Sequence, residues 1–89
     1  MAQVRGNGVL VLTKKELYFE MWMPKKILHI SIRAIKEVTI TKWHLKKSKG
    51  RPMLKVIFEN EKKAEDAVAW LLRDVEHWKS GLEALIKAT

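Results

Sequence analysis

Apolar and polar residues alternate with a period of two through the first two thirds of the chain. Side chains along a β-strand point in turn to opposite faces of the sheet, so this alternation predicts strands that are buried on one face. Short connections between such strands are typical of an antiparallel sandwich or a small barrel. The alternating stretches are residues 17–22, 28–33, 35–45 and 54–58, and before them residues 9–13 are a β-branched run of strand length.

Three segments between these stretches predict turns. Gly6-Asn7-Gly8 precedes the run at residues 9–13, and both residue types favour turns. Pro24 has no backbone N–H to donate to a neighbouring strand, so we expect a turn over residues 23–26. The polar segment "KKSKGRP", residues 46–52, interrupts the alternation and predicts a long hairpin loop before the next strand.

The last third of the chain allows two interpretations. Its apolar residues recur at helical spacing, which predicts one long helix over residues 63–87. The alternative ends a strand at Leu72 and begins a helix with Asp74 as N-cap, Glu76 in the first turn and Lys87 near the C-terminus. The apolar residues with helical spacing are Ala67, Leu71, Val75, Trp78, Leu82 and Leu85.

The length and composition predict one globular domain over residues 1–89. A chain of 89 residues buries only about 60 to 65% of the surface that its unfolded form exposes, so the core is thin. No apolar run approaches the roughly 18 residues of a membrane span, and the first residues lack the apolar segment of a secretory signal. We therefore expect a cytoplasmic protein.

The charge of the chain favours anionic partners. The formal net charge is +8, which suits nucleic acid, acidic lipid or an acidic protein. Cysteine is absent, which excludes disulfides and thiolate metal sites. Lysine and glutamate dominate the polar residues, a bias that fits a heat-adapted organism using surface ion pairs.

The histidines form no recognisable catalytic or metal-binding motif. His29, His44 and His77 lie in separate predicted elements, without a carboxylate at ligand spacing. His29 alternates with Leu28 and Ile30 and is therefore expected to face outward from a strand. We predict that the protein is not an enzyme and that it holds no metal or cofactor.

The order of the sequence patterns resembles the pleckstrin-homology-like superfamily, and in particular its GRAM-type domains. The segments that carry the resemblance are "GVLVLTKKELYFE", "ILHISIRAIKEVTI", "LKVIF" and "DAVAWLLRDVEHW", within residues 6–86. The residues that occupy the positions of the family pattern are Gly8, Leu10, Leu12, Thr13, Leu17, Phe19, Ile30, Ile32, Ile35 and Val38.

The resemblance implies a mainly β fold with one C-terminal α-helix. Six to seven strands would form a bent antiparallel sandwich or barrel, with a short first strand drawn from residues 1–5. The last third then becomes a strand over 66–72, paired with 53–59, and a helix over 74–87 whose Trp78 caps the core. The predicted core is Leu10, Leu12, Leu17, Phe19, Ile30, Ile32, Val38, Val56, Phe58, Trp78, Leu82 and Leu85.

The same resemblance implies a binding rim at one end of the sandwich. It would gather the loops after the first, third and sixth strands, and place residues 46–51 at the opposite end. Trp22 and Met23 beside lysines would form an apolar and basic rim that suits a partner protein or an anionic membrane surface. The predicted binding residues are Trp22, Met23, Lys25, Lys26, Lys62 and Lys63, with Arg5 near them.

A second basic cluster surrounds the predicted hairpin loop, and Trp43 offers a stacking platform there for nucleic acid. The function expected from the whole sequence is a non-catalytic interaction module with a protein partner or a second copy of itself. Acidic lipid headgroups are a second target, reached by peripheral contact with the membrane, and nucleic-acid binding is the alternative. The alternative patch is Lys42, Trp43, His44, Lys46, Lys47, Lys49 and Arg51.

Overall fold

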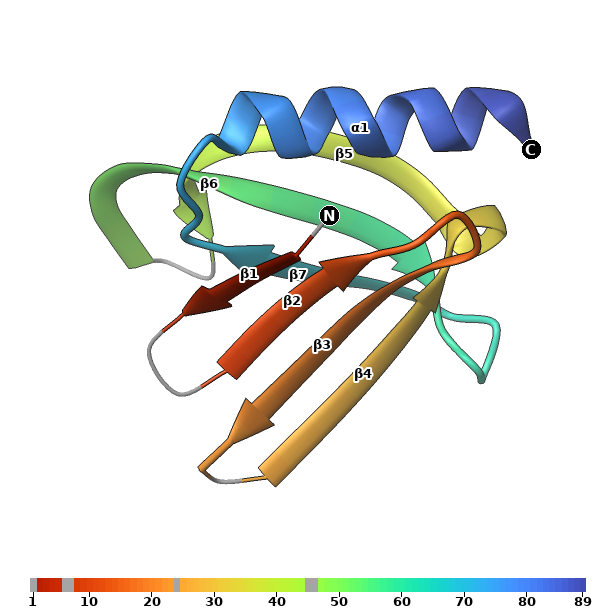
Figure 1. Cartoon of the computed structure of the whole chain (residues 1–89), viewed down its shortest axis with the longest axis horizontal. Coiled ribbons are helices and arrows are strands. Elements are labelled where there is room, and N and C mark those ends of the chain that lie inside the picture. Colours follow the sequence, from red (N-terminus) through yellow and green to blue (C-terminus); the bar gives the residue numbers. More distant parts are fainter. Residues whose placement is uncertain (1, 6–7, 24, 45–46) are drawn as a thin grey trace.

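Seven strands are followed by one helix in the described part of the chain (Figure 1). The computed structural model describes residues 2–5, 8–23, 25–44 and 47–89. A single 3₁₀ turn, η1 (Ile32–Ala34), lies between the fourth and fifth strands. The other elements are β1 (Ala2–Arg5), β2 (Gly8–Leu12), β3 (Glu16–Trp22), β4 (Lys25–Ser31), β5 (Ile35–His44), β6 (Lys47–Glu59), β7 (Glu65–Trp70) and α1 (Val75–Ala88).

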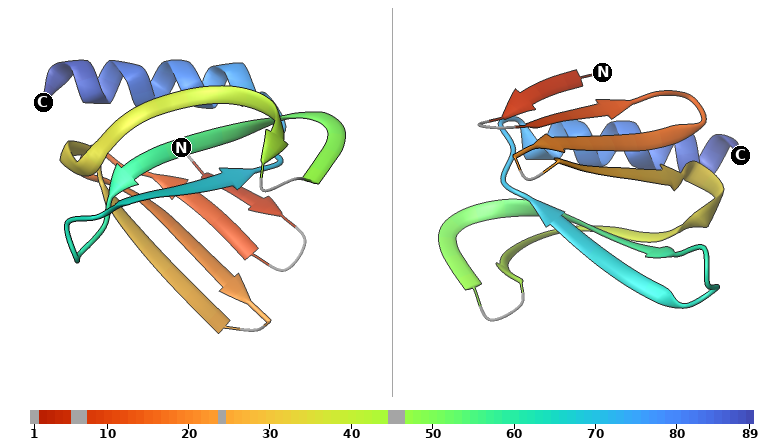
Figure 2. Two further views of the ribbon diagram at one scale, coloured as in Figure 1. Left: turned by 180° about the vertical axis from the view of Figure 1, so that it is seen from behind. Right: turned by 90° about the horizontal axis from the view of Figure 1, so that it is seen from below.

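The strands form two antiparallel sheets that face each other. The first has the order β1-β2-β3-β4 and the second β5-β6-β7, so every paired neighbour is also a neighbour in the sequence. Helix α1 lies across the sandwich and contacts β5, β6 and η1 (Figures 1 and 2). Two separate sheets identify the fold as a sandwich rather than a closed barrel. The mainly β fold with one C-terminal helix is therefore confirmed.

One apolar cluster lies between the two sheets and the helix. It contains buried residues of β2, β3, β4, β5, β6, β7 and α1. Of the residues expected in this core, Phe19 and Leu85 are half-buried and pack against it, and the others are buried. The buried residues of the cluster are Leu10, Leu12, Leu17, Ile30, Ile32, Ile35, Val38, Leu54, Val56, Phe58, Trp70, Trp78 and Leu82.

The last third is a strand followed by a helix, as the second interpretation predicted. Strand β7 pairs with residues 54–59 of β6 and ends at Trp70, two residues before the predicted end. Helix α1 begins directly after Asp74. Asp74 is the N-cap residue, as predicted, but its side chain makes no cap hydrogen bond and its backbone is left-handed, with φ of 53°. The backbone carbonyl of Asp74 instead accepts hydrogen bonds from the N–H groups of His77 and Trp78.

Three other predicted boundaries are corrected. Strand β4 begins at Lys25 rather than Leu28, because Lys25 and Lys26 pair with Trp22 and Met21 across a shorter turn. The same strand ends at Ser31, where the chain enters η1. Strand β6 begins at Lys47, within the segment predicted as a solvated loop, and Lys47 and Ser48 pair with His44 and Trp43 of β5 before the register shifts.

A side-chain amide ties the first strand to the segment before the helix. Nε2 of Gln3 donates to the backbone carbonyl of Arg73 at 3.3 Å, and the N–H of Arg73 donates to Oε1 of Gln3 at 3.0 Å. Strand β1 also pairs along its whole length with β2. It is therefore joined both to the first sheet and to the segment before α1.

Candidate docking surface on the β3–β4 hairpin

The large apolar side chains that remain exposed in the described part of the chain all belong to the β3–β4 hairpin. Trp22 is 49% exposed, Met23 is 78% exposed and Ile27 is 47% exposed. Lys25 and Lys26 are also exposed. We call Trp22, Met23, Lys25 and Lys26 the hairpin tip.

The strand register explains why these side chains are exposed. Residues paired directly across two antiparallel strands share a face, so Trp22 and Lys25 lie on the same face of the sheet. Two residues earlier in β3, Glu20 pairs with Ile27 on that face. Leu17 is on the other face and is 1% exposed, which identifies that face as the one toward the core. Trp22 and Ile27 therefore point away from the core by the alternation of the strand itself.

The predicted gathering of Lys62 and Lys63 with the hairpin tip is wrong. Both lysines lie in the turn between β6 and β7, at the end of the sandwich opposite the β3–β4 turn (Figures 1 and 2). The topology gives the reason. Because η1 is only three residues long, β5 starts beside the end of β4. Strand β6 then runs back along β5, so it ends beside the start of β5. The β6–β7 turn therefore lies near the end of β4 and far from the β3–β4 turn at its beginning.

The second basic cluster lies mostly beyond the described side chains. Lys42 is exposed near the end of β5, but Lys46 and the side chains of Trp43, His44, Lys47, Lys49 and Arg51 fall outside the described part of the chain. The end of the sandwich where β5 meets β6 lies on the same side as the β3–β4 turn, not opposite to it as predicted (Figures 1 and 2).

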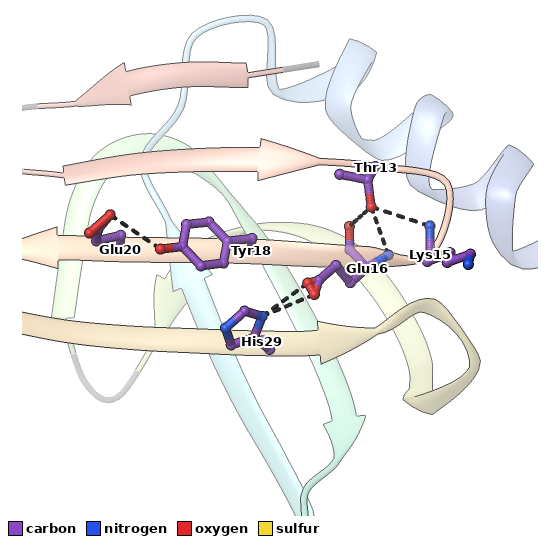
Figure 3. A network of polar contacts seen from close by, with 6 residues as sticks. All are labelled: Thr13, Lys15, Glu16, Tyr18, Glu20 and His29. Atoms are coloured by element: carbon purple, nitrogen blue, oxygen red, sulfur yellow. Dashed lines mark hydrogen bonds and ion pairs between the residues drawn. The ribbon is translucent and has the colours of Figure 1, made fainter.

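Polar side chains cluster farther along the outer face of β3 and β4 (Figure 3). Nδ1 of His29 lies 2.9 Å from both carboxylate oxygens of Glu16. A carboxylate only accepts hydrogen bonds, so this nitrogen carries the proton. The ring of His29 also meets the ring of Tyr18 edge-on, at 4.9 Å between centroids. His29 is thus an outward-facing strand residue, as expected, but its partner, thirteen positions away in the sequence, was not predicted.

Tyr18 shares this face with two carboxylates. Its hydroxyl donates to Oε1 of Glu20 at 3.2 Å. Partial burial, this hydrogen bond and the negative charges of Glu20 and Glu16 raise the pKa of Tyr18 above its ordinary value of 10.0. All of these effects disfavour the charged tyrosinate, so the folded protein holds the proton more tightly than the unfolded chain.

The titration of Tyr18 can be followed without ambiguity because it is the only tyrosine of the chain. We expect the tyrosinate absorbance to rise with a midpoint above pH 10.0, and Glu20→Gln to lower that midpoint. The pKa of Tyr18 is higher in the folded protein than in the unfolded chain. The contribution of the protonated tyrosine to the free energy of unfolding is therefore complete below pH 10, and it is lost as the pH rises through the folded pKa. Tyr18→Phe should therefore lose less stability than the original chain over this interval. A midpoint at or below 10 would contradict the assignment.

A groove of 670 Å³ runs between β4 and the β6–β7 turn. The side chain of Asn60 fixes the turn, since its Oδ1 accepts hydrogen bonds from the backbone N–H groups of Lys62 at 2.9 Å and Ala64 at 3.1 Å. The floor of the groove is apolar at Leu28 and Phe58, and its outer wall carries charges of both signs. The charged residues along it are Glu59, Glu61, Lys62, Lys63 and Asp66.

Comparison with family models, with curated proteins and with solved structures found no match to this chain. Among the described residues, no helix is long and apolar enough to cross a membrane. The described side chains also include no group of three or more His, Cys, Asp or Glu residues arranged to hold a metal ion.

Proposed function

We propose that this chain is a non-catalytic interaction module that binds a partner protein through the hairpin tip. The observation that carries the proposal is the exposure of Trp22 and Met23, at 49% and 78%, at the end of a hairpin whose other large apolar residues mostly pack inward. Apolar side chains that gather on a surface, with polar residues around them, mark sites of interaction.

The geometry of the tip suits an anchor for a partner. Trp22 is the last residue of β3 and is paired with Lys25, so its backbone is held by the sheet before any partner arrives. A preorganised anchor loses little conformational entropy on binding. Tryptophan is also among the residues that most often dominate binding energy when a partner excludes water around it.

Assignment to the pleckstrin-homology-like superfamily, as a GRAM-type domain, is part of this proposal. Its support is the order of the elements, since four strands, then three strands, then a helix follow one another in two facing sheets. The position of Trp78 at the core, 2% exposed, also agrees with the resemblance. Many members of this superfamily act by binding proteins rather than by catalysis.

An anionic membrane surface is the second candidate partner, and the two lysines of the tip favour it. Lys25 and Lys26 are both exposed beside Trp22. Tryptophan prefers the headgroup region of a bilayer, and each lysine near an anionic surface adds about 1 kcal/mol of attraction. Nucleic-acid binding through residues 42–51 stays a prediction of the sequence.

Photo-crosslinking tests the protein partner. A photoreactive residue placed at Met23, in the cells that make this protein, should join the chain to one partner, and the same residue at Lys14 should not. With that partner purified, Trp22→Ala or Met23→Ala should weaken binding by about 2 kcal/mol, roughly thirtyfold, with little dependence on salt. Binding unchanged by both substitutions would contradict docking through the tip.

Vesicles of phosphatidylcholine with phosphatidylserine separate the lipid candidate from the protein candidate. If the tip binds anionic membranes, the chain should sediment with these vesicles but not with phosphatidylcholine alone. Reversal of charge at Lys25 and Lys26 together should then remove about 2 kcal/mol or more of binding, and rising salt should reduce that loss. Lys14→Glu together with Lys15→Glu, in the β2–β3 turn, is the matched control for net charge.

A further inference from the structure

Strand β4 leaves one edge of the first sheet open. Among the described strands it pairs only with β3, and its other side faces outward (Figure 1). Such an edge presents backbone N–H and C=O groups that can pair with another strand. The seven residues of β4 pair with β3 in unbroken register, so no bulge turns this edge away from a partner.

The centre of β4 also lacks the charges that usually protect an edge. Its lysines, Lys25 and Lys26, stand together at the beginning, and Ile27, Leu28 and Ile30 follow with only His29 between them. Ile27 is 47% exposed on the outer face. Natural proteins often place lysine or proline within an exposed edge to prevent pairing, and here the middle of the strand carries neither.

Charge is unequally distributed along this edge on the outer face. Lys25 stands at the beginning of β4, next to Trp22. At the end of β4, Ser31 is paired with Glu16 of β3. The Glu16 carboxylate therefore lies one strand farther from the open edge than the small side chain of Ser31. The outer face of the edge therefore has a lysine at one end and, beside Ser31 at the other, the carboxylate of Glu16, which also contacts His29, so these two groups are complementary when the edge is turned end to end.

We propose that β4 pairs in antiparallel fashion with β4 of a second copy of this chain, about a two-fold axis through Leu28. The pairing joins the two first sheets into one continuous sheet. The same surface is used on both subunits, as closed two-fold dimers require. The residue pairs are Lys25 with the partner's Ser31, Lys26 with the partner's Ile30, Ile27 with the partner's His29, and Leu28 with the partner's Leu28.

This register satisfies the charges and covers the apolar residues. Lys25 comes to lie beside the partner's Ser31, and Glu16 of that subunit is two strand spacings from Lys25, about 10 Å between backbones. The side chains of Lys25 and the partner's Glu16 together span that distance, because the serine side chain between them is small. On the outer face Ile27 lies opposite the partner's His29, whose ring leans over its own β3 onto Tyr18 and Glu16.

The inner side of the edge has room for the partner strand. The groove beside β4 has a volume of 670 Å³, with Leu28 and Phe58 on its floor. Leu28 is only half-buried in the single chain, and the partner's Leu28 adds apolar cover at the axis. Burial of Leu28 and Ile27 on opposite faces of the new sheet favours association through the hydrophobic effect.

Sedimentation equilibrium with charge-reversed chains tests the proposal. The original chain should form a dimer whose population rises with concentration. Lys25→Glu alone and Glu16→Lys alone should each weaken the dimer about tenfold or more, because like charges then meet twice across the axis. An equimolar mixture of these two variants should restore a dimer, since each Lys25→Glu chain then faces a Glu16→Lys chain and both crossings are attractive. Lys87→Glu, which makes the same change of charge at an exposed position of α1, should dimerise like the original chain.

Two results would overturn the proposal. One is a chain that stays monomeric up to about 1 mM, the upper limit of weak association. The other is a dimer in which the two variants, shown to be folded by their thermal melting, do not recover association when mixed. Met23→Ala separates this inference from the proposed function, since it should weaken docking through the tip and leave the dimer unchanged.

Discussion

Replacing Trp78 with alanine is expected to lower the free energy of unfolding by about 3 to 5 kcal/mol. Trp78 is 2% exposed and belongs to the cluster shared by both sheets. It is also the bulkiest of the fully buried side chains. Its removal would leave a large cavity beneath α1, which lies against β5, β6 and η1. A domain of this size has only about 5 to 15 kcal/mol of stability in total, so the loss would leave it close to unfolding at room temperature.

Urea denaturation followed by circular dichroism measures this effect. Ser80→Ala is the matched control, because Ser80 is exposed on the same helix and its substitution should change stability by less than about 0.5 kcal/mol. Equal denaturation midpoints for Trp78→Ala and Ser80→Ala would show that the helix does not close the core. If Trp78→Ala does not fold, Trp78→Phe provides a smaller loss that can still be measured.

Gly8→Ala is expected to lower the free energy of unfolding by about 1 to 3 kcal/mol. A Cβ atom at this position would lie 2.7 Å from the backbone carbonyl oxygen of Glu20 and 3.4 Å from Cα of Met21. Gly8 stands between Arg5 of β1 and Met21 of β3, so the added carbon meets the backbone of a central pair of strands. The strands must separate locally to accommodate it, which weakens their hydrogen bonds.

The contact with a backbone atom makes this prediction specific. Because the carbonyl belongs to the main chain, a second substitution Glu20→Ala should not recover the stability lost by Gly8→Ala. Ser31→Ala, on the exposed strand β4, serves as a control for alanine in this sheet and should stay within about 0.5 kcal/mol of the original chain. Thermal melting of these three variants beside the original chain provides the comparison, and a Gly8→Ala chain as stable as the original would contradict the close packing of β2 on β3.

The hydrophobic pattern predicted most of the strands because burial on one face imposes alternation. It failed at β6, where Lys47 continues a ladder that side-chain polarity alone does not reveal. It was also ambiguous before the helix, since Ala67 and Leu71 fit a helical stripe whereas Val68 and Trp70 fit a strand face. Pairing with Val56 and Leu54 of β6 selects the strand, and such long-range pairing is not encoded in local spacing.

The candidate site was predictable only where it depends on neighbouring residues. Trp22, Met23, Lys25 and Lys26 are adjacent in the sequence, and the turn between them brings them together without help from distant elements. The position of Lys62 depends on the end of the sandwich at which the β6–β7 turn lies. The path of the chain through η1 determines that end, and the local sequence around Lys62 does not show it. Glu16 and His29 lie thirteen positions apart and meet only through the register of β3 and β4.

The double hydrogen bond between Gln3 and Arg73 has a consequence for folding during synthesis. The two residues are 70 positions apart, so this contact cannot form until residue 73 has been made. Each described strand, β1 included, pairs with a neighbour in the sequence and can pair earlier, because contacts between nearby residues close quickly. The bond between Gln3 and Arg73 therefore closes only after all the described strands have been made, and a nascent chain stalled before residue 73 should leave the Gln3 side chain without this partner.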